Sequence, residues 1–291
     1  MMAASPHAPR RSPLVRTVRV LRRAALYATV IGVCVALLFP VYWMFVTSLR
    51  PTRYTITYPP AFLPEEVRWT AYLELFQTIP IATWLRNTVF VSIGVTVVCL
   101  LLSIVGAYAL SSFTWRGRSL FGFSLLGTQM LPEALLVIPI FIIFRGFGLI
   151  DTLHGLVLAD AAFIVPVTVW ILKGFFDTIP REVREAALVD GCGPLGVLGR
   201  IILPLSAPAL VTISVIAFFD GWNEYLFAST FISSADLRPA TVGLASFIGE
   251  LATPVELVFA ATAIFTIPPM IFYFVMQRYI ISGLTGGAVK G

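Results

Sequence analysis

The sequence EAALVDGCGPLGVLGRIILP, from Glu185 to Pro204, is a polar, glycine-rich insert in a chain that is otherwise strongly apolar. Long apolar segments lie on both sides of it. Such an insert is either a plain solvated loop or a segment that contacts another protein. Its composition alone leaves these two interpretations about equal, so the rest of the chain has to separate them.

The composition of the chain is that of a membrane protein. Hydrophobic residues make up 58% of its 291 residues, charged residues 12%, and the mean hydropathy is +0.91. Ordinary soluble domains are about 45–50% apolar and about 25% charged. The three cysteines have no spacing typical of a disulfide framework or a zinc site. We therefore predict an integral membrane protein without a metal site.

Apolar segments of spanning length occur six times. A bilayer core about 30 Å thick needs about 20 mostly apolar residues per helix. We predict an all-α protein whose transmembrane domain, 24–281, lies between a basic tail, 1–23, and a C-terminal tail, 282–291. Its six predicted spans are 24–48, 87–112, 119–148, 155–176, 204–228 and 258–281.

The distribution of basic residues predicts the orientation of the spans. Arginines gather in the N-terminal tail, and most of the 20 lysines and arginines fall on the same side of the predicted membrane as that tail. Because basic loops stay in the cytoplasm, both termini are predicted to be cytoplasmic. The loop that contains the insert, 177–203, would then also be cytoplasmic, between the fourth and fifth spans.

Two further patterns concern packing of the spans. Small residues recur at four-residue spacing along the second span, which favours close contact with another helix; they are Cys99, Ser103, Ala107 and Ser111. Tryptophans near predicted span ends are typical of an interfacial belt; they are Trp43, Trp84, Trp115, Trp170 and Trp222.

The segment DTIPREVREAALVDG predicts a short helix over about 180–191. Thr178 or Asp177 would cap its start and Gly191 would end it. One face would carry Val183, Ala186 and Ala187, small enough for another surface to approach closely, and the rim of that face would carry Glu182, Arg184 and Glu185. The nearby GCGPLG resembles a dinucleotide-binding pattern, but no strand precedes it.

Several motifs together resemble one family. The insert fits the pattern EAA-x3-G-x9-I-x-LP at every fixed position. This pattern resembles the EAA loop of ABC importer permeases. The segments RNTVFVS (86–92), FFDGWNEYLFA (218–228) and QRYIISGLTGGAVKG (277–291) are similar to those of maltose-type carbohydrate permeases. The likeness extends from about residue 20 to the end, and it implies the type I ABC importer permease fold.

The resemblance implies a role for the insert. In that family the EAA segment is a coupling helix that seats in a groove of a cytoplasmic ATPase. The ATPase-coupling residues would then be Glu185, Ala186, Ala187, Gly191, Ile201, Leu203 and Pro204. The insert would transmit motion and would not be catalytic.

The resemblance also implies partners. The sequence has no GxxxxGK[ST] pattern for holding nucleotide phosphates, so this chain is expected to bind no cofactor and to catalyse no reaction. ATP and Mg²⁺ would be bound by an ABC ATPase dimer. The other expected partners are a second homologous permease, an extracytoplasmic sugar-binding protein and membrane lipid. No nucleic acid is expected as a partner. The expected location is a bacterial or archaeal cell membrane.

Polar residues inside the predicted spans suggest a substrate path. Charged residues there are costly and usually face a cavity or a partner. The candidates are Gln129, Glu133, Asp160, Asp220, Trp222, Asn223 and Glu224. Each also has an ordinary structural interpretation. It could belong to the interfacial aromatic belt, lie on the solvated surface, or contact another helix. The acids favour a neutral sugar over an anionic one, although relatives also carry glycerol phosphate.

Two other classes of membrane protein were weighed. A self-sufficient proton-coupled carrier would use Glu133 or Asp160, but such carriers commonly show internal repeats, which this sequence lacks. A membrane enzyme would need a cluster of catalytic groups, and the two histidines, His7 and His154, lie far apart in sequence.

Overall fold

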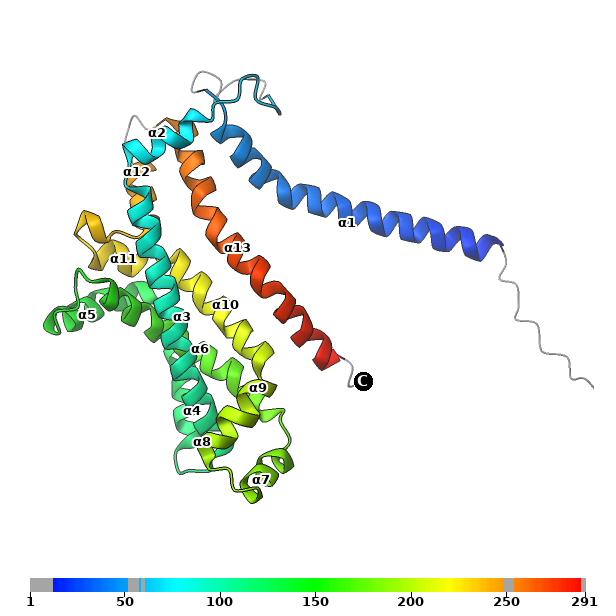
Figure 1. The fold of residues 1–291 in the computed structure, drawn as a ribbon, viewed down its shortest axis with the longest axis vertical. Coiled ribbons are helices and arrows are strands. Elements are labelled where there is room, and N and C mark those ends of the chain that lie inside the picture. The colour runs from blue at the N-terminus through cyan, green and yellow to red at the C-terminus, as the bar shows by residue number, and fades with distance from the viewer. Residues whose placement is uncertain (1–12, 52–57, 59–60, 249–253, 289–291) are drawn as a thin grey trace, which may run out of the picture.

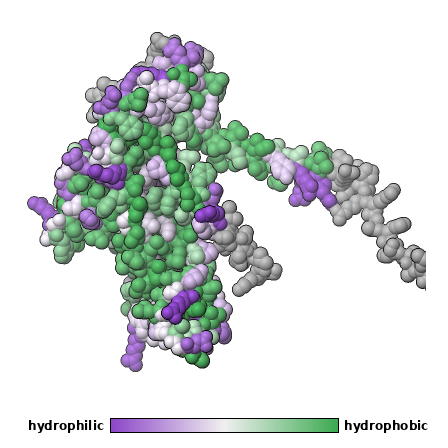
Figure 2. Space-filling model, viewed as in Figure 1, coloured by the Kyte–Doolittle hydropathy of each residue, from purple (hydrophilic) through white to green (hydrophobic). Residues whose placement is uncertain are grey.

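The computed structural model describes residues 13–51, 58, 61–248 and 254–288. Within these ranges every regular element is a helix, which confirms the predicted all-α class. His7 lies outside the described residues. The face of the helical body seen in Figure 2 is largely apolar, with polar side chains at its two ends and in a few patches at mid-height.

Four helices of the described part of the chain are each long and apolar enough to cross a membrane. They are α1 (Pro13–Ser48), α3 (Ile81–Ser112), α6 (Leu153–Asp177) and α13 (Val255–Ala288). These helices contain the first, second, fourth and sixth predicted spans. Residues 13–23 and 282–288 belong to α1 and α13, so the predicted tail boundaries do not coincide with helix ends.

The other two predicted spans are broken. Residues 119–148 form α4 (Arg118–Thr128) and α5 (Glu133–Gly146), which meet at an angle of 104°. Pro132 stands at this break in an extended conformation, and it has no N–H to continue the preceding helix. The fifth span is bent by 80° between Pro194–Leu205 and Ala207–Phe231. Described residues therefore give six spans only when each bent pair counts as one.

The transmembrane body is built around α3, α6 and α10 (Ala207–Asn223), with α13 against α10 (Figure 1). One end of the body carries α2 (Thr70–Thr78) and α12 (Ala240–Ile248). The other end carries α7 (Arg181–Val189). The short elements are α8 (Pro194–Val197), the π-helical turn η2 (Leu198–Ile202), α9 (Leu203–Leu205), α11 (Leu226–Phe231) and the 3-10 turn η3 (Ala235–Leu237).

The small residues of α3 form its contact with α6, as predicted. Cys99, Ser103 and Ala107 are buried, and the hydroxyl groups of Ser103 and Thr168 lie 2.6 Å apart. Ser111 donates a hydrogen bond of 2.7 Å to Asp177 at the last turn of α6. The absence of larger side chains along this face lets the two helices pack closely over most of their length.

The belt prediction is wrong for two tryptophans. Trp84 is 6% exposed and packs against Gly243 of α12, where an added Cβ would lie 2.3 Å from the indole ring. Trp222 is 1% exposed and lies between Phe218 and Phe265. Both rings therefore fill the protein core rather than the membrane interface. Trp115, in contrast, is exposed at the α7 end of the body.

Candidate coupling segment and membrane path

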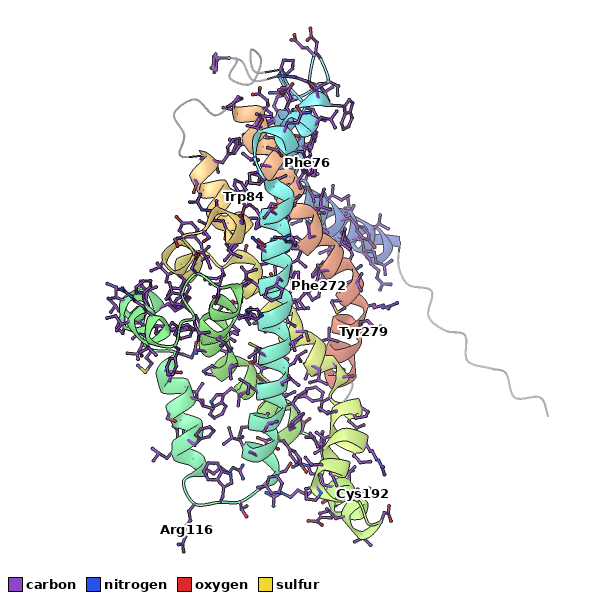
Figure 3. All side chains as sticks on the ribbon, turned by 60° about the vertical axis from the view of Figure 1, so that its left-hand side comes forward. Phe76, Trp84, Arg116, Cys192, Phe272 and Tyr279 are labelled. Atoms are coloured by element: carbon purple, nitrogen blue, oxygen red, sulfur yellow. The ribbon has the colours of Figure 1, made fainter. Side chains whose placement is uncertain are left out.

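The insert begins with α7, at the same end of the body as Arg116 and Cys192 (Figures 1 and 3). Pro180 occupies the position before its first turn, and Gly191 follows its end with φ +85°. Glycine is the residue that adopts this left-handed conformation without strain. The helix is therefore shorter than the predicted 180–191, but its predicted stop is confirmed.

The predicted caps belong to other contacts. The Thr178 hydroxyl donates to the carbonyl of Phe175 at 2.7 Å, inside the last turn of α6. Asp177 accepts hydrogen bonds from Lys173 at 2.6 Å and from Ser111 at 2.7 Å. Both side chains thus complete the end of α6, and neither caps α7.

Arg184 fastens α7 to the transmembrane body. Its guanidinium donates to the carbonyls of Phe176 and Ile179 at 2.5 and 3.3 Å and to the Ser112 hydroxyl at 3.1 Å. These bonds hold the ends of α3 and α6 together with α7. The prediction that Arg184 lies on the rim of a docking face is wrong, because its side chain points inward to these acceptors.

The two alanines of the EAA sequence face opposite ways. Ala187 is 6% exposed and packs in an apolar cluster with Phe176, Ile179 and Val197. Ala186 and Glu185 are exposed. The predicted face of Val183, Ala186 and Ala187 is therefore divided, since Ala187 faces the body of the same chain and Ala186 faces outward.

The return towards the membrane is also anchored. Tyr108 of α3 donates to the carbonyl of Pro194 at 2.8 Å. Ile202 is fully buried, Ile201 and Leu203 are half-buried, and Pro204 is exposed. Sequence reasoning missed Tyr108 and Ile202. The pattern I-x-LP contains Ile202 only as its variable position, and nothing in the sequence links Tyr108 to Pro194.

Two path candidates lie at the break between α4 and α5. Gln129 ends α4 and donates to the carbonyl of Phe163 in α6 at 2.7 Å. Glu133 is the first residue of α5 and is exposed. A carboxylate at a helix start is favoured by the helix dipole. Broken helices of this kind place helix ends inside the membrane, where transporters often bind substrates.

Four carboxyl groups lie in the region beside this break. Asp160 of α6 is 5% exposed, and an added Cβ on Gly221 of α10 would lie 3.3 Å from its Oδ2. Asp220, Glu224 and Glu133 are close enough to act on Asp160 electrostatically. Among the described residues, no group of acidic, histidine or cysteine side chains could hold a metal ion. The structure thus gathers candidates from three helices that are far apart in sequence.

Trp222, Asn223 and Glu224 have local contacts. The ring of Trp222 is covered, so it offers no free face for stacking on a sugar. Glu224 accepts from the backbone N–H groups of Phe227 and Ala228 at 2.5 and 3.0 Å, which caps α11. Asn223 is exposed and donates to the carbonyl of Phe219 at 2.7 Å.

Residues 99–286 match the family described as "Binding-protein-dependent transport system inner membrane component". The chain belongs to this family. It is 36% identical over 275 residues to the inner membrane ABC transporter permease protein YcjP of Escherichia coli (strain K12), covering 94% of this chain and 98% of that one. This family membership confirms a multi-pass permease subunit of an ABC transporter.

Two further members of the same class support the assignment. The trehalose/maltose transport system permease protein MalG of Thermococcus litoralis is 34% identical over 280 residues, covering 94% of this chain and 98% of that one. A chain of a bacterial ABC transporter involved in the import of the acidic polysaccharide alginate is 26% identical, with a TM-score of 0.79, covering 94% of this chain and 99% of that one. The predicted ABC importer permease fold is therefore confirmed.

Proposed function

We propose that this permease imports a neutral sugar and that α7 couples it to a separate ATPase. One observation carries the coupling assignment: α7 stands at one end of the transmembrane body, is fastened there by Arg184, and exposes Glu185 and Ala186 outward. A short helix with a fixed base and a small outward side chain can transmit displacement between two proteins. Ala187, Gly191, Ile201, Leu203 and Pro204 would set its position.

A neutral sugar is supported by one relative and by charge. MalG of Thermococcus litoralis is a trehalose/maltose permease. The carboxyl groups of Glu133, Asp160, Asp220 and Glu224 gather beside the α4–α5 break. Carboxylates accept hydrogen bonds from sugar hydroxyls, whereas an acidic substrate would be repelled there. The substrate would pass along this junction, with Gln129 and Asn223 at its edges.

The partners would be a second permease, an ABC ATPase dimer and an extracytoplasmic sugar-binding protein. The position of α1 favours a second permease as partner. This helix projects sideways from the body, and its side chains are exposed from Arg19 to Phe39 (Figure 1). An apolar helix in this position fits the surface of a neighbouring subunit. The ATPases would bind ATP and Mg²⁺ and carry out hydrolysis. Both termini and α7 would lie in the cytoplasm.

The test is the substitution Ala186→Asp in the reconstituted transporter. Docking would bury the added charge without a partner, which costs several kcal/mol, whereas a solvated position changes by no more than about 0.5 kcal/mol. We expect the variant to insert normally but to lose ATPase stimulation by sugar-loaded binding protein and to co-purify poorly with the ATPase. Ala186→Ser, similar in size and uncharged, is the matched control and should behave as the wild type.

Full stimulation and full co-purification of Ala186→Asp would refute the coupling role of α7. Measuring uptake with and without ATP in the same vesicles separates this function from a proton-coupled carrier. Uptake driven by a proton gradient in the absence of ATP would favour the carrier instead.

A further inference from the structure

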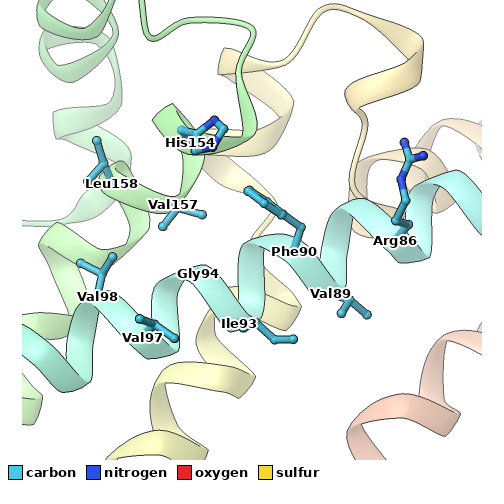
Figure 4. A pocket seen from close by; sticks show the side chains of 10 residues that line it. All are labelled: Arg86, Val89, Phe90, Ile93, Gly94, Val97, Val98, His154, Val157 and Leu158. Carbon is cyan, nitrogen blue, oxygen red and sulfur yellow. The ribbon is translucent and has the colours of Figure 1, made fainter.

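A groove lies between α3 and α6 on the half of the body opposite α7 (Figure 4). Its volume is about 690 Å³, within the roughly 300–1,000 Å³ of small-molecule sites. Its length is lined by apolar side chains, among them Phe90, Ile93 and Val97 of α3 and Val157 and Leu158 of α6. Phe90, Ile93, Val97 and Leu158 are each more than 40% exposed, so the groove opens on the surface of this chain.

Gly94 forms the floor of the groove. A Cβ at this position would lie 2.7 Å from Cγ2 of Val157, closer than two carbon atoms can approach. The glycine therefore lets α3 and α6 meet closely at Val157. No side chain of residue 94 projects into the groove above this contact.

The groove has one arginine and one histidine at its rim. Arg86 is exposed at one end, and His154 stands beside Phe90 with ring centroids 5.3 Å apart (Figure 4). Among the described residues, the Arg86 guanidinium donates a long hydrogen bond of 3.4 Å to Asn87 Oδ1. No carboxylate of the described residues lies within ion-pair distance of Arg86. The Arg86 guanidinium is therefore available to bind an anion.

The dimensions match one lipid leaflet. Arg86 and Val98 mark the two ends of the groove along α3, and twelve residues at about 1.5 Å each give roughly 18 Å. Half of a hydrocarbon core about 30 Å thick is about 15 Å. A phosphate bound at Arg86 would thus place an acyl chain along the apolar lining, ending near the middle of the membrane.

We propose that this groove binds an anionic phospholipid of the leaflet opposite α7. The Arg86 guanidinium bonds the headgroup phosphate through paired N–H groups, with His154 beside it, and one acyl chain covers Gly94 and Val157. A protein helix fits less well, because it would have to supply a carboxylate opposite Arg86. This site is separate from α7 and from the carboxyl junction.

The test uses the assembled transporter, extracted from vesicles of phosphatidylcholine with or without phosphatidylglycerol, and native mass spectrometry of retained lipid. We expect phosphatidylglycerol to be retained in preference to phosphatidylcholine. Arg86→Gln should lower this retention at least about 10-fold, the effect of one lost charge-assisted bond. Val97→Trp fills the groove and should also lower it. Arg145→Gln, at an exposed arginine outside the groove lining, is the control and should retain the lipid.

A phosphatidylglycerol with a photoreactive acyl chain locates the site directly. Labelled peptides should come from 86–98 and 154–158. Equal retention of both lipids, or undiminished retention in Arg86→Gln, would overturn the proposal. Absence of label from these peptides would also overturn it, and would indicate that a helix of the second permease fills the groove. If Arg86→Gln fails to assemble, the comparison of lipids in the wild type and Val97→Trp decides the matter.

Discussion

Single side chains determine how α7, the proposed coupling helix, is held. Arg184 is the clearest case, because one guanidinium bonds acceptors at the ends of α3 and α6. Its planar arrangement of donors reaches several acceptors at once, which a lysine ammonium does not reproduce. The side chain that orients α7 is therefore different from the side chains that α7 exposes.

Removing this fastening should uncouple the transporter without altering the exposed face of α7. We expect Arg184→Ala to lower binding-protein-stimulated ATPase activity and to reduce thermal stability by about 1–3 kcal/mol, since two carbonyls and a hydroxyl lose their donor. Arg181→Ala, at an exposed arginine of the same helix, is the control. Equal activity of the two variants would argue against a fastening role for Arg184.

Asp151 gives a pH-dependent contact at the opposite end of the body. It lies in the turn between α5 and α6 with φ 57°, and its carboxylate accepts from the backbone N–H groups of Ser233 and Ser234 and from the Ser234 hydroxyl. The hydrogen bond from the Ser234 side chain is the largest cause that lowers the pKa of Asp151. The turn is thereby tied to the segment after α11.

Because its pKa is lower in the folded state, Asp151 stabilises the fold above its unfolded pKa of about 3.9. This stabilisation should be lost as the pH falls through the lowered folded pKa. We expect Asp151→Asn, which tolerates the same backbone conformation, to cost about 1 kcal/mol at pH 7 for this solvent-facing site. Melting of the purified complex between pH 7 and pH 3 is the measurement. If the melting temperatures of the wild type and Asp151→Asn change in parallel with pH across that range, the prediction is wrong.

At the scale of helices, contacts between α3 and α6 carry the fold. Ser103, Ala107 and Ser111 lie on one face of α3, and the first two are fully buried against neighbouring helices. Hydrophobic burial gives little advantage between helices in lipid, so close packing of small residues takes its place. The stability of this pair should depend on side-chain size at these positions.

Ala107→Leu should therefore destabilise the assembled complex. The added atoms have no space in the cluster that includes Leu172 and Phe176, and overpacking of this kind costs about 1–3 kcal/mol. Val105→Leu adds bulk at a position of α3 that is 65% exposed and should leave melting unchanged. Identical melting temperatures for the two variants in detergent would refute the packing assignment.

The sequence predicts elements better than their bends. Apolar length was enough to locate the spans, because the bilayer sets that length. Proline did not reveal which span breaks: Pro139 and Pro166 lie inside continuous helices, while Pro132 stands at a 104° bend. The difference comes from tertiary contacts such as Gln129 with the carbonyl of Phe163, which no local pattern contains.

The same limit applies to the faces of α7. Helical spacing alone does not distinguish whether Ala186 or Ala187 faces outward. Their separation depends on where Arg184 finds its acceptors, which follows from the packed ends of α3 and α6. The resemblance predicted a short helix in this segment, and the structure was needed to say which of its residues are exposed.

At the scale of the whole molecule, the proposed transport path and the proposed coupling segment lie in different parts of the chain. The carboxyl junction joins α5, α6 and α10, whereas α7 follows α6 and leads back, through α8 and α9, to α10. Movement of α7 would thus reach the junction through the two helices that flank it. Glu133 enters the junction from the broken α4–α5 pair, so its charge tests the path without touching the α7 fastening.

Glu133→Gln should slow sugar uptake while leaving assembly and stimulated ATP hydrolysis intact. The change keeps the shape and the hydrogen-bonding capacity of the side chain but removes one of the junction's acidic charges. We expect uptake of the sugar that saturates the binding protein to fall by about 10-fold, equivalent to about 1.4 kcal/mol in the rate-limiting barrier. The matched control is Glu65→Gln, at an exposed acid between α1 and α2. Uptake and ATP hydrolysis are measured together in vesicles, because a path residue should reduce sugar carried per ATP, whereas a fastening residue should reduce hydrolysis itself. Unchanged uptake kinetics in Glu133→Gln would remove the carboxyl junction from the path and leave its acids a structural role.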